Sequence, residues 1–161
     1  MPGSLVGVNT LIPNRLVYQS VEACVVEELN GYDTIRREVK TGDKSRLDLL
    51  LEKGETDRCF VEIKNCTLVE DGIASFPDAV TLRGQKHLGE LQRLIASGNR
   101  CVMFYLIQRM DAEVFKPADQ IDPEYGRKLR RAVEHGVEIL VYDVSVDLKR
   151  ICLNRKIPYQ L

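Results

Sequence analysis

A continuous apolar run from Cys101 to Ile107 constrains the fold of this chain more than any other feature. Because side chains alternate between the two faces of a strand, such a run suits a strand only when both faces of its sheet are covered. Val137 to Val144 shows the same pattern and predicts a second buried strand. Layers must then lie on both sides of the sheet, which favours an α/β sandwich around a mixed sheet.

Three amphipathic patterns predict the helices that cover this sheet. Apolar residues at three- and four-residue spacing predict a helix over residues 14–30, with Asn14 as its N-cap. A second helix is predicted to begin at Thr81, and a third to span Glu124–His135. Glycine-containing segments follow both of these helices and are typical of helix ends.

The remaining strands are predicted from short apolar or alternating segments separated by turns. The short turns favour an antiparallel meander for the first three strands. A long connection of little periodicity, residues 65–80, follows them. The strands not yet named are Tyr32–Val39, Arg46–Leu51 and Arg58–Leu68, with Arg150–Leu153 as a candidate edge strand.

The composition bounds the class of protein without pointing to a partner. A chain of 161 residues has the size of one domain, and its 23 basic and 24 acidic residues leave a net charge of −1. No apolar stretch is long enough to span a bilayer and no secretion signal is recognisable, so a cytoplasmic protein without a membrane partner is expected. The 5 scattered cysteines lack zinc-site spacing and are predicted to be small buried hydrophobes.

Charged residues interrupt two of the apolar strands. Alternation along a strand puts Glu62 and Lys64 on one side and Val61 and Ile63 on the other. Asp48 lies among leucines on the preceding strand. Charges in such positions are costly unless they are paired or bound to a cation. If the two strands form a hairpin, the two acids and the lysine converge at one site.

Two interpretations of this trio stay open from spacing alone. Asp48 and Glu62, helped by the backbone carbonyl of Ile63, would supply the oxygen ligands that Mg²⁺ or Mn²⁺ prefers. The cation would activate water for phosphodiester cleavage, and Lys64 would orient that water or stabilise the developing charge. The other interpretation is a buried ion pair between Lys64 and one of the acids, with no chemistry attached.

Several separate segments carry a resemblance to a known family. Asp48 followed by Glu62-x-Lys64 on the next strand resembles the PD-(D/E)xK nuclease superfamily. A wider set of segments resembles the sugar fermentation stimulation protein A family of prokaryotes. Those segments are Arg46–Asp48, Val61–Glu70, Phe76–Thr81, Arg83–Leu88, Gln108–Asp111, Ala118–Pro123 and Gly136–Glu138.

The resemblance implies a fold and a general role. The fold is a restriction-endonuclease-like mixed sheet flanked by helices, with an α-β-β-β-α-β core and a further α-β. The role is that of a DNA-binding protein connected with the regulation of sugar (maltose) metabolism. Members of the family usually carry an N-terminal OB-like domain, and residues 1–161 are expected to be the single nuclease-like domain without it.

Transferred by position, the resemblance also implies the site. Asp48 and Glu62 become metal ligands and Lys64 becomes the catalytic lysine. Glu22 on the first predicted helix is a weaker candidate for a further acidic ligand, since some superfamily members use one there. A solvated surface position is the simpler interpretation of Glu22.

A second group of residues is expected to contact nucleic acid. Arg83 and Lys86 lie in the first turns of a predicted helix, where the helix dipole favours anions, and His87 adjoins them. Gln108 and Arg109 leave the end of a buried strand, where they could reach the rim of the site. Ordinary surface or strand-end positions are the alternative for all five.

Three hypotheses about function follow. The first is a Mg²⁺- or Mn²⁺-dependent nuclease that acts on DNA rather than RNA, with homodimers as one arrangement that cuts both strands. The second is a DNA-binding regulator that keeps the nuclease fold without turnover. The third is an interaction module in which the acids bind a structural cation.

Overall fold

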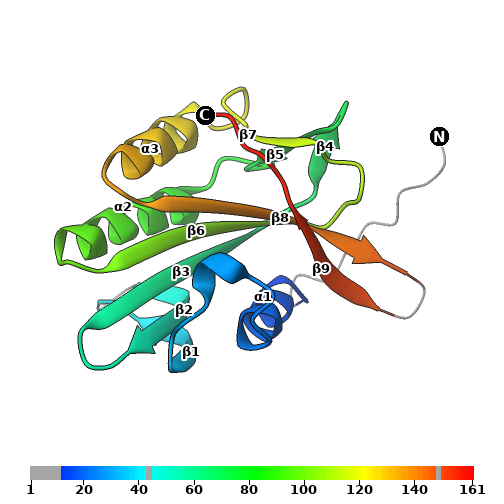
Figure 1. The fold of residues 1–161 in the computed structure, drawn as a ribbon. Coiled ribbons are helices and arrows are strands. Elements are labelled where there is room, and N and C mark those ends of the chain that lie inside the picture. The colour runs from blue at the N-terminus through cyan, green and yellow to red at the C-terminus, as the bar shows by residue number, and fades with distance from the viewer. Residues whose placement is uncertain (1–11, 43–44, 148–149) are drawn as a thin grey trace.

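A six-stranded mixed sheet runs through the middle of the computed structural model, which describes residues 12–42, 45–147 and 150–161 (Figure 1). Its strands are β1 (Thr34–Lys40), β2 (Arg46–Lys53), β3 (Asp57–Cys66), β6 (Arg100–Ile107), β8 (Glu138–Val146) and β9 (Ile151–Lys156), and they lie side by side in that order. The edge strand expected near the C-terminus is confirmed as β9. The predicted α/β fold with a mixed sheet flanked by helices is confirmed.

The directions of the strands follow from the lengths of their connections. β1, β2 and β3 form the predicted antiparallel meander, whereas β3, β6 and β8 are parallel to one another. Parallel neighbours need crossover connections, and α2 (Leu82–Ala96) and α3 (Pro123–Glu134) belong to these. Because β6 lies inside the sheet and both faces of the sheet are covered, all of Cys101–Ile107 is buried, as the apolar run predicts.

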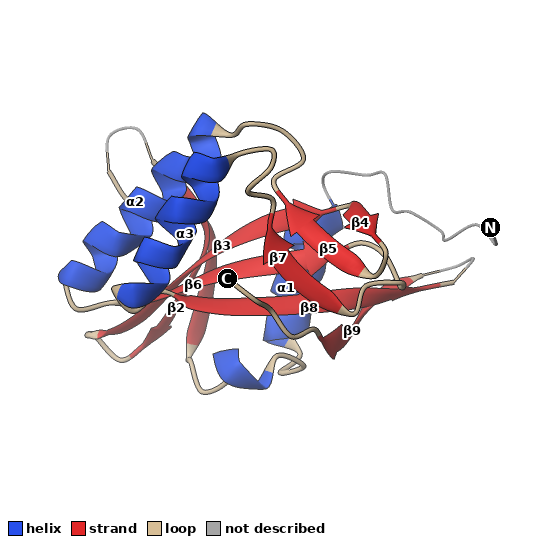
Figure 2. Ribbon diagram, turned by 90° about the horizontal axis from the view of Figure 1, so that it is seen from above, coloured by secondary structure: helices blue, strands red, loops and turns tan. Residues whose placement is uncertain are grey.

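Helices cover the sheet on both faces (Figure 2). α2 and α3 lie side by side on one face, where Leu88, Leu91 and Leu129 join a core with Met103 and Tyr105 of β6. On the other face, α1 (Ile12–Glu22) and the short 3₁₀ helix η1 (Glu27–Leu29) pack their apolar side chains on the sheet. None of the helices in the described part of the chain is long and apolar enough to cross a membrane.

The first helix is shorter than predicted. Instead of spanning residues 14–30, α1 ends at Glu22, and Asn14 lies inside it rather than at its N-cap. Val25 N bonds to Ser20 O (2.9 Å) and Cys24 N to Val21 O (3.0 Å), while Cys24 has a φ of 58°. This is a Schellman ending with a cysteine where glycine is usual, so the sequence carries no stop signal there.

The segment predicted as an irregular connection, residues 65–80, contains two strands of a second sheet. β4 (Leu68–Glu70) and β5 (Ile73–Phe76) form a hairpin, and β7 (Val114–Pro117) pairs with β5 in parallel. Asp71 and Gly72 both have positive φ, 49° and 78°, as a type I′ turn requires. An Asp-Gly pair is a strong hairpin signal, but strands this short show no periodicity of their own.

The cysteines do not share one environment. Cys59, Cys66 and Cys101 are buried, as predicted, but Cys24 and Cys152 are exposed. The prediction that all of them are buried hydrophobes is therefore wrong for these two. Cys24 occupies the left-handed ending of α1, and Cys152 lies on the edge strand β9.

The start of α2 is held by a buried carboxylate of α3. Asp122, the N-cap of α3, accepts bonds from the backbone N–H groups of Tyr125 and Thr81 and from the side-chain amide of Gln85. Thr81 in turn caps α2 by accepting from Gly84 N (3.0 Å). Burial acts to raise the pKa of Asp122, but these donors outweigh it and lower the pKa. The first turns of α2 are therefore fixed relative to the start of α3.

Two glycines of α2 provide a test of this packing. A Cβ at Gly84 would lie 2.7 Å from Thr81 Cγ2 and 3.1 Å from Tyr125 Cε2, whereas a Cβ at Gly89 would contact nothing. We expect Gly84→Ala to lower the free energy of unfolding by about 1–3 kcal/mol through overpacking. Gly89→Ala should raise it by about 0.5–1 kcal/mol through helix propensity. Urea unfolding measures both, and equal changes would contradict the close packing at Gly84.

Candidate functional site

Glu62 lies at the centre of a buried polar cluster on the face of the sheet that α2 covers. Lys64 Nζ donates to Glu62 Oε1 over 2.6 Å, and His87 Nδ1 bonds to the same oxygen. Lys64 Nζ and His87 Nδ1 are 3.2 Å apart. Val61 and Ile63 face the opposite core, so the predicted alternation along β3 is what the structure has. The side chains of Glu62 and His87 are only 3% and 6% exposed.

Asp48 reaches this cluster from β2. The pairing of β2 with β3 ends at Leu49 and Val61, so the backbone N–H group of Ile63 has no partner in the backbone of β2 and is available to a side chain. Ile63 N donates to Asp48 Oδ2 over 2.8 Å, and Asn14 of α1 donates from Nδ2 to Asp48 Oδ1 over 2.7 Å. The structure thus brings the three predicted residues of the trio together and adds Asn14, for which the sequence predicts only a helix cap.

Burial and neighbouring charges separate the two carboxyl groups. Burial, together with the charge of Glu62, raises the pKa of Asp48 to about 6, although the bond from Ile63 N acts in the opposite direction. For Glu62, burial also acts to raise the pKa, but the bonds and charges of His87 and Lys64 outweigh it and lower the pKa. Glu62 is therefore ionised at neutral pH, and Asp48 ionises at a cost.

One oxygen of Glu62 has no protein partner. Oε2 is buried and makes no hydrogen bond within the described residues, whereas Oε1 accepts two. A self-contained ion pair would leave no such oxygen, because an unpaired buried carboxylate oxygen is costly. Across residues 12–42, 45–147 and 150–161 no group of three or more His, Cys, Asp or Glu is arranged to hold a metal ion. A cation would therefore need oxygen ligands beyond Asp48 and Glu62, such as backbone carbonyls and water.

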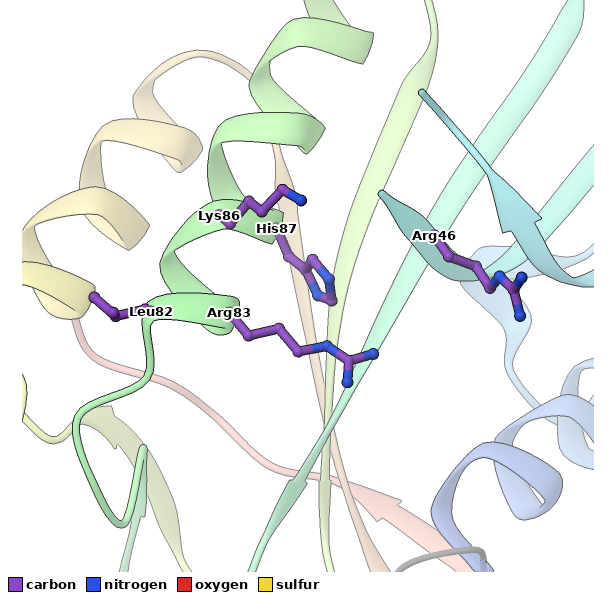
Figure 3. Close-up of a pocket in the computed structure, with 5 residues that line it drawn as sticks. All are labelled: Arg46, Leu82, Arg83, Lys86 and His87. Atoms are coloured by element: carbon purple, nitrogen blue, oxygen red, sulfur yellow. The ribbon is translucent and has the colours of Figure 1, made fainter. Parts of the chain in front are cut away.

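A basic cavity adjoins the cluster. Its volume is about 430 Å³, and Arg46 of β2 and Leu82, Arg83, Lys86 and His87 of α2 line it. Figure 3 shows Arg83 and His87 directed from the helix toward the strands, with Arg46 on the far side. His87 belongs to both places, since its ring lines the cavity while Nδ1 contacts Glu62. Arg46 was not among the residues expected to contact nucleic acid.

The other predicted residues fall in different places. Arg83 and Lys86 are exposed beside the cavity, and their contact with nucleic acid stays a prediction. Gln108 is fully buried and donates from Nε2 to Asn65 Oδ1 over 2.7 Å, so the structure does not place it on a binding surface.

Two further candidates bind to neighbours of their own. Arg109 forms an ion pair with Asp111, so the carboxylate of Asp111 already balances the charge of its guanidinium. Glu22 is exposed at the end of α1 and accepts from Tyr18 Oη, away from the trio. The residue of α1 that reaches the site is Asn14, near the start of the helix.

Comparison with known proteins gives a consistent result. Residues 11–150 match the family described as "Sugar fermentation stimulation protein RE domain". A sugar fermentation stimulation protein homolog of Pelobacter propionicus is 55% identical over 156 residues, which cover 97% of this chain and 67% of the relative. The homolog of Geobacter metallireducens is 54% identical over 157 residues, with the same coverage of 97% and 67%. The chain spans about two thirds of the length of these relatives.

A solved structure is also similar over the whole fold. The SfsA protein of Pyrococcus furiosus, solved in complex with Ca²⁺, is 30% identical and superposes with a TM-score of 0.91. The match covers 99% of this chain and 69% of that one.

The raised pKa of Asp48 predicts an unusual effect of removing its charge. The folded pKa of about 6 lies above the ordinary 3.8, so stability falls as pH rises between these values, because the unfolded chain releases the proton first. Asp48→Asn removes the cost of ionising the carboxyl group but also removes one accepted hydrogen bond. The net effect, measured in EDTA at pH 7.5, should be a rise of about 1–2 kcal/mol in the free energy of unfolding.

The gain should disappear only as pH falls well below 3.8, where Asp48 is protonated in both the folded and the unfolded state. Asp119→Asn is the control of opposite sign, because pairing with Arg130 lowers the pKa of Asp119 and its loss should only destabilise. An Asp48→Asn variant that is less stable than the wild type at pH 7.5 would contradict the electrostatic account.

Proposed function

We propose that this chain, which belongs to the sugar fermentation stimulation protein family, binds DNA and carries a site for divalent-cation-dependent phosphodiester cleavage. The observation that carries the proposal is the cluster of Asp48, Glu62 and Lys64 with one buried oxygen of Glu62 unpartnered. Two carboxylates in one site repel each other, and a bound cation would offset this repulsion, while the lysine beside them suits a phosphate.

The donor set fits a hard divalent cation, Mg²⁺ or Mn²⁺. Glu62 Oε2 is available, Asp48 accepts only one hydrogen bond at each oxygen, and the carbonyl of Ile63 is a third candidate ligand. A related protein at 30% identity was solved in complex with Ca²⁺, another oxygen-preferring cation. When bound, such a cation supplies activation of water and neutralisation of charge on the phosphate.

The residues of the chain divide the remaining work. Lys64 is 12% exposed and close to Glu62, so its ammonium can stabilise negative charge that develops on a phosphate at the site. Ile63 N and Asn14 hold the carboxylate of Asp48 in one orientation. Neither of these donors needs to move during the reaction, which favours precise positioning of the phosphodiester.

The basic cavity supports a nucleic-acid substrate. Arg46, Arg83 and Lys86 place positive charge beside the acidic site, although the chain as a whole has a net charge of −1. Local charge of this kind attracts the phosphate backbone without sequence preference. We infer DNA rather than RNA from the nuclease superfamily that the motifs resemble.

A second candidate function is DNA binding without turnover, in a regulator of sugar metabolism genes. The bond between Lys64 and Glu62, at 2.6 Å, favours it, because the lysine is already satisfied within the protein. The unpartnered Oε2 of Glu62 and the cost of ionising Asp48 favour the enzyme.

Cleavage assays separate these functions. We expect single-stranded or duplex DNA to be cut in Mg²⁺ or Mn²⁺ and not in EDTA. Glu62→Gln and Lys64→Ala should each lower the rate by about 100-fold or more. Glu70→Gln on the exposed end of β4 is the control and should cleave normally.

Binding without cleavage in the wild type would reject the enzyme and support the regulator. Indifference to all nucleic acids combined with cation binding would reject both and leave an interaction module. RNA of the same sequence, assayed in parallel, tests the preference for DNA.

Arg83 tests the nucleic-acid contact separately. It is exposed at the cavity and makes no ion pair with any residue of the described ranges. Arg83→Ala should weaken DNA binding similarly for all sequences and reduce the salt dependence of log K by about one counterion. Arg131→Ala, an exposed arginine of α3 outside the cavity, is the control. Fluorescence anisotropy over a salt series measures both, and an unchanged slope for Arg83→Ala would place the DNA elsewhere.

A further inference from the structure

The two donors on Glu62 approach the same oxygen. His87 Nδ1 and Lys64 Nζ both contact Oε1, and they lie 3.2 Å from each other. Two donors that converge on one acceptor are necessarily close, so this distance needs no hydrogen bond between them. Because Glu62 is a carboxylate, it can only accept, and Nδ1 of His87 must then carry the hydrogen.

This arrangement distinguishes the two oxygens of Glu62. With both donors on Oε1, the other oxygen, Oε2, is left buried and unpartnered among the described residues. Lys64 alone would not fix that choice, because a flexible ammonium can follow either oxygen as the carboxylate turns. A histidine ring has few conformations, and His87 is buried, so its ring holds the carboxylate of Glu62 in one orientation.

His87 is itself held from behind. It lies in the second turn of α2, and the start of that helix is bound to α3 through Asp122, Thr81 and Gln85. Gly84, packed against Tyr125, brings this part of the helix close to its neighbours. The position of Nδ1 is therefore fixed by helix packing rather than by the strand that carries Glu62.

We infer that His87 is a positioning residue of the cation site, which turns the carboxylate of Glu62 so that Oε2 faces a divalent cation. The inference rests on the proposed function, since it concerns the cation at Asp48 and Glu62. It assigns His87 a role through Nδ1 and Glu62, in place of the direct contact with nucleic acid expected from its place in the sequence.

Cation binding without any substrate tests the inference. Calorimetric titration of the whole chain with Mn²⁺ or Ca²⁺ gives the affinity of the wild type and of three variants. His87→Leu removes the donor and should weaken binding by about 10- to 100-fold, as loss of a group that orients a metal ligand does. His87→Asn keeps an N–H donor at the δ position and should restore most of the affinity. His87→Gln moves the donor to the ε position and should not.

The outcomes are distinct. A wild type that binds neither cation overturns the proposed function, and the inference with it. A wild type that binds, with His87→Leu or His87→Gln binding as tightly, overturns the inference alone. If His87→Leu does not fold, the comparison of the two amide variants still decides, because Asn and Gln differ only in where the donor lies.

Discussion

The burial of one carboxylate, Glu62, and the partial burial of another, Asp48, is the constraint on which the surrounding structure depends. A buried acid is costly unless donors surround it. Strand β3 supplies Lys64 and the N–H group of Ile63, but the strands alone are not enough. α1 adds Asn14 and α2 adds a histidine, so helices on opposite faces of the sheet each hold one acid. The three-layer architecture is a requirement of the site as much as of the apolar core.

Much of the fold could be predicted because its signals are local or strongly patterned. The apolar run on β6 requires a sheet covered on both faces, and the alternation around Glu62 and Lys64 assigns them to one side. The failures have physical causes. Cys24 takes the left-handed conformation that glycine usually marks, so the end of α1 leaves no trace in the sequence. β7 exists because it pairs with the distant β5, and only a folded chain brings the two together.

The site divides in the same way. The trio on β2 and β3 follows from strand periodicity and one hairpin. The partners of the trio, Asn14 and His87, depend on how helices dock on the sheet, and a sequence pattern shows only that each lies on a helix. The burial of Gln108 is a tertiary effect as well, since it comes from packing at the end of β6 against Asn65. Spacing predicts which side chains share a strand face, and packing decides which of them touch.

The hydrogen bonds of Asp122 make the geometry of the cluster around Glu62 depend on a later part of the chain. Among the described residues, all those that bond to the carboxylates of Asp48 and Glu62 lie in the sequence from Asn14 to His87. The carboxylate that fastens the start of α2 comes later in the chain, on α3. A nascent chain leaving the ribosome therefore exposes all the acids and their donors before it can lock them together. The start of α2 cannot be bound in this way until the residues around Asp122 have been synthesised, so the geometry of the centre depends on a part of the chain that is made after the centre itself.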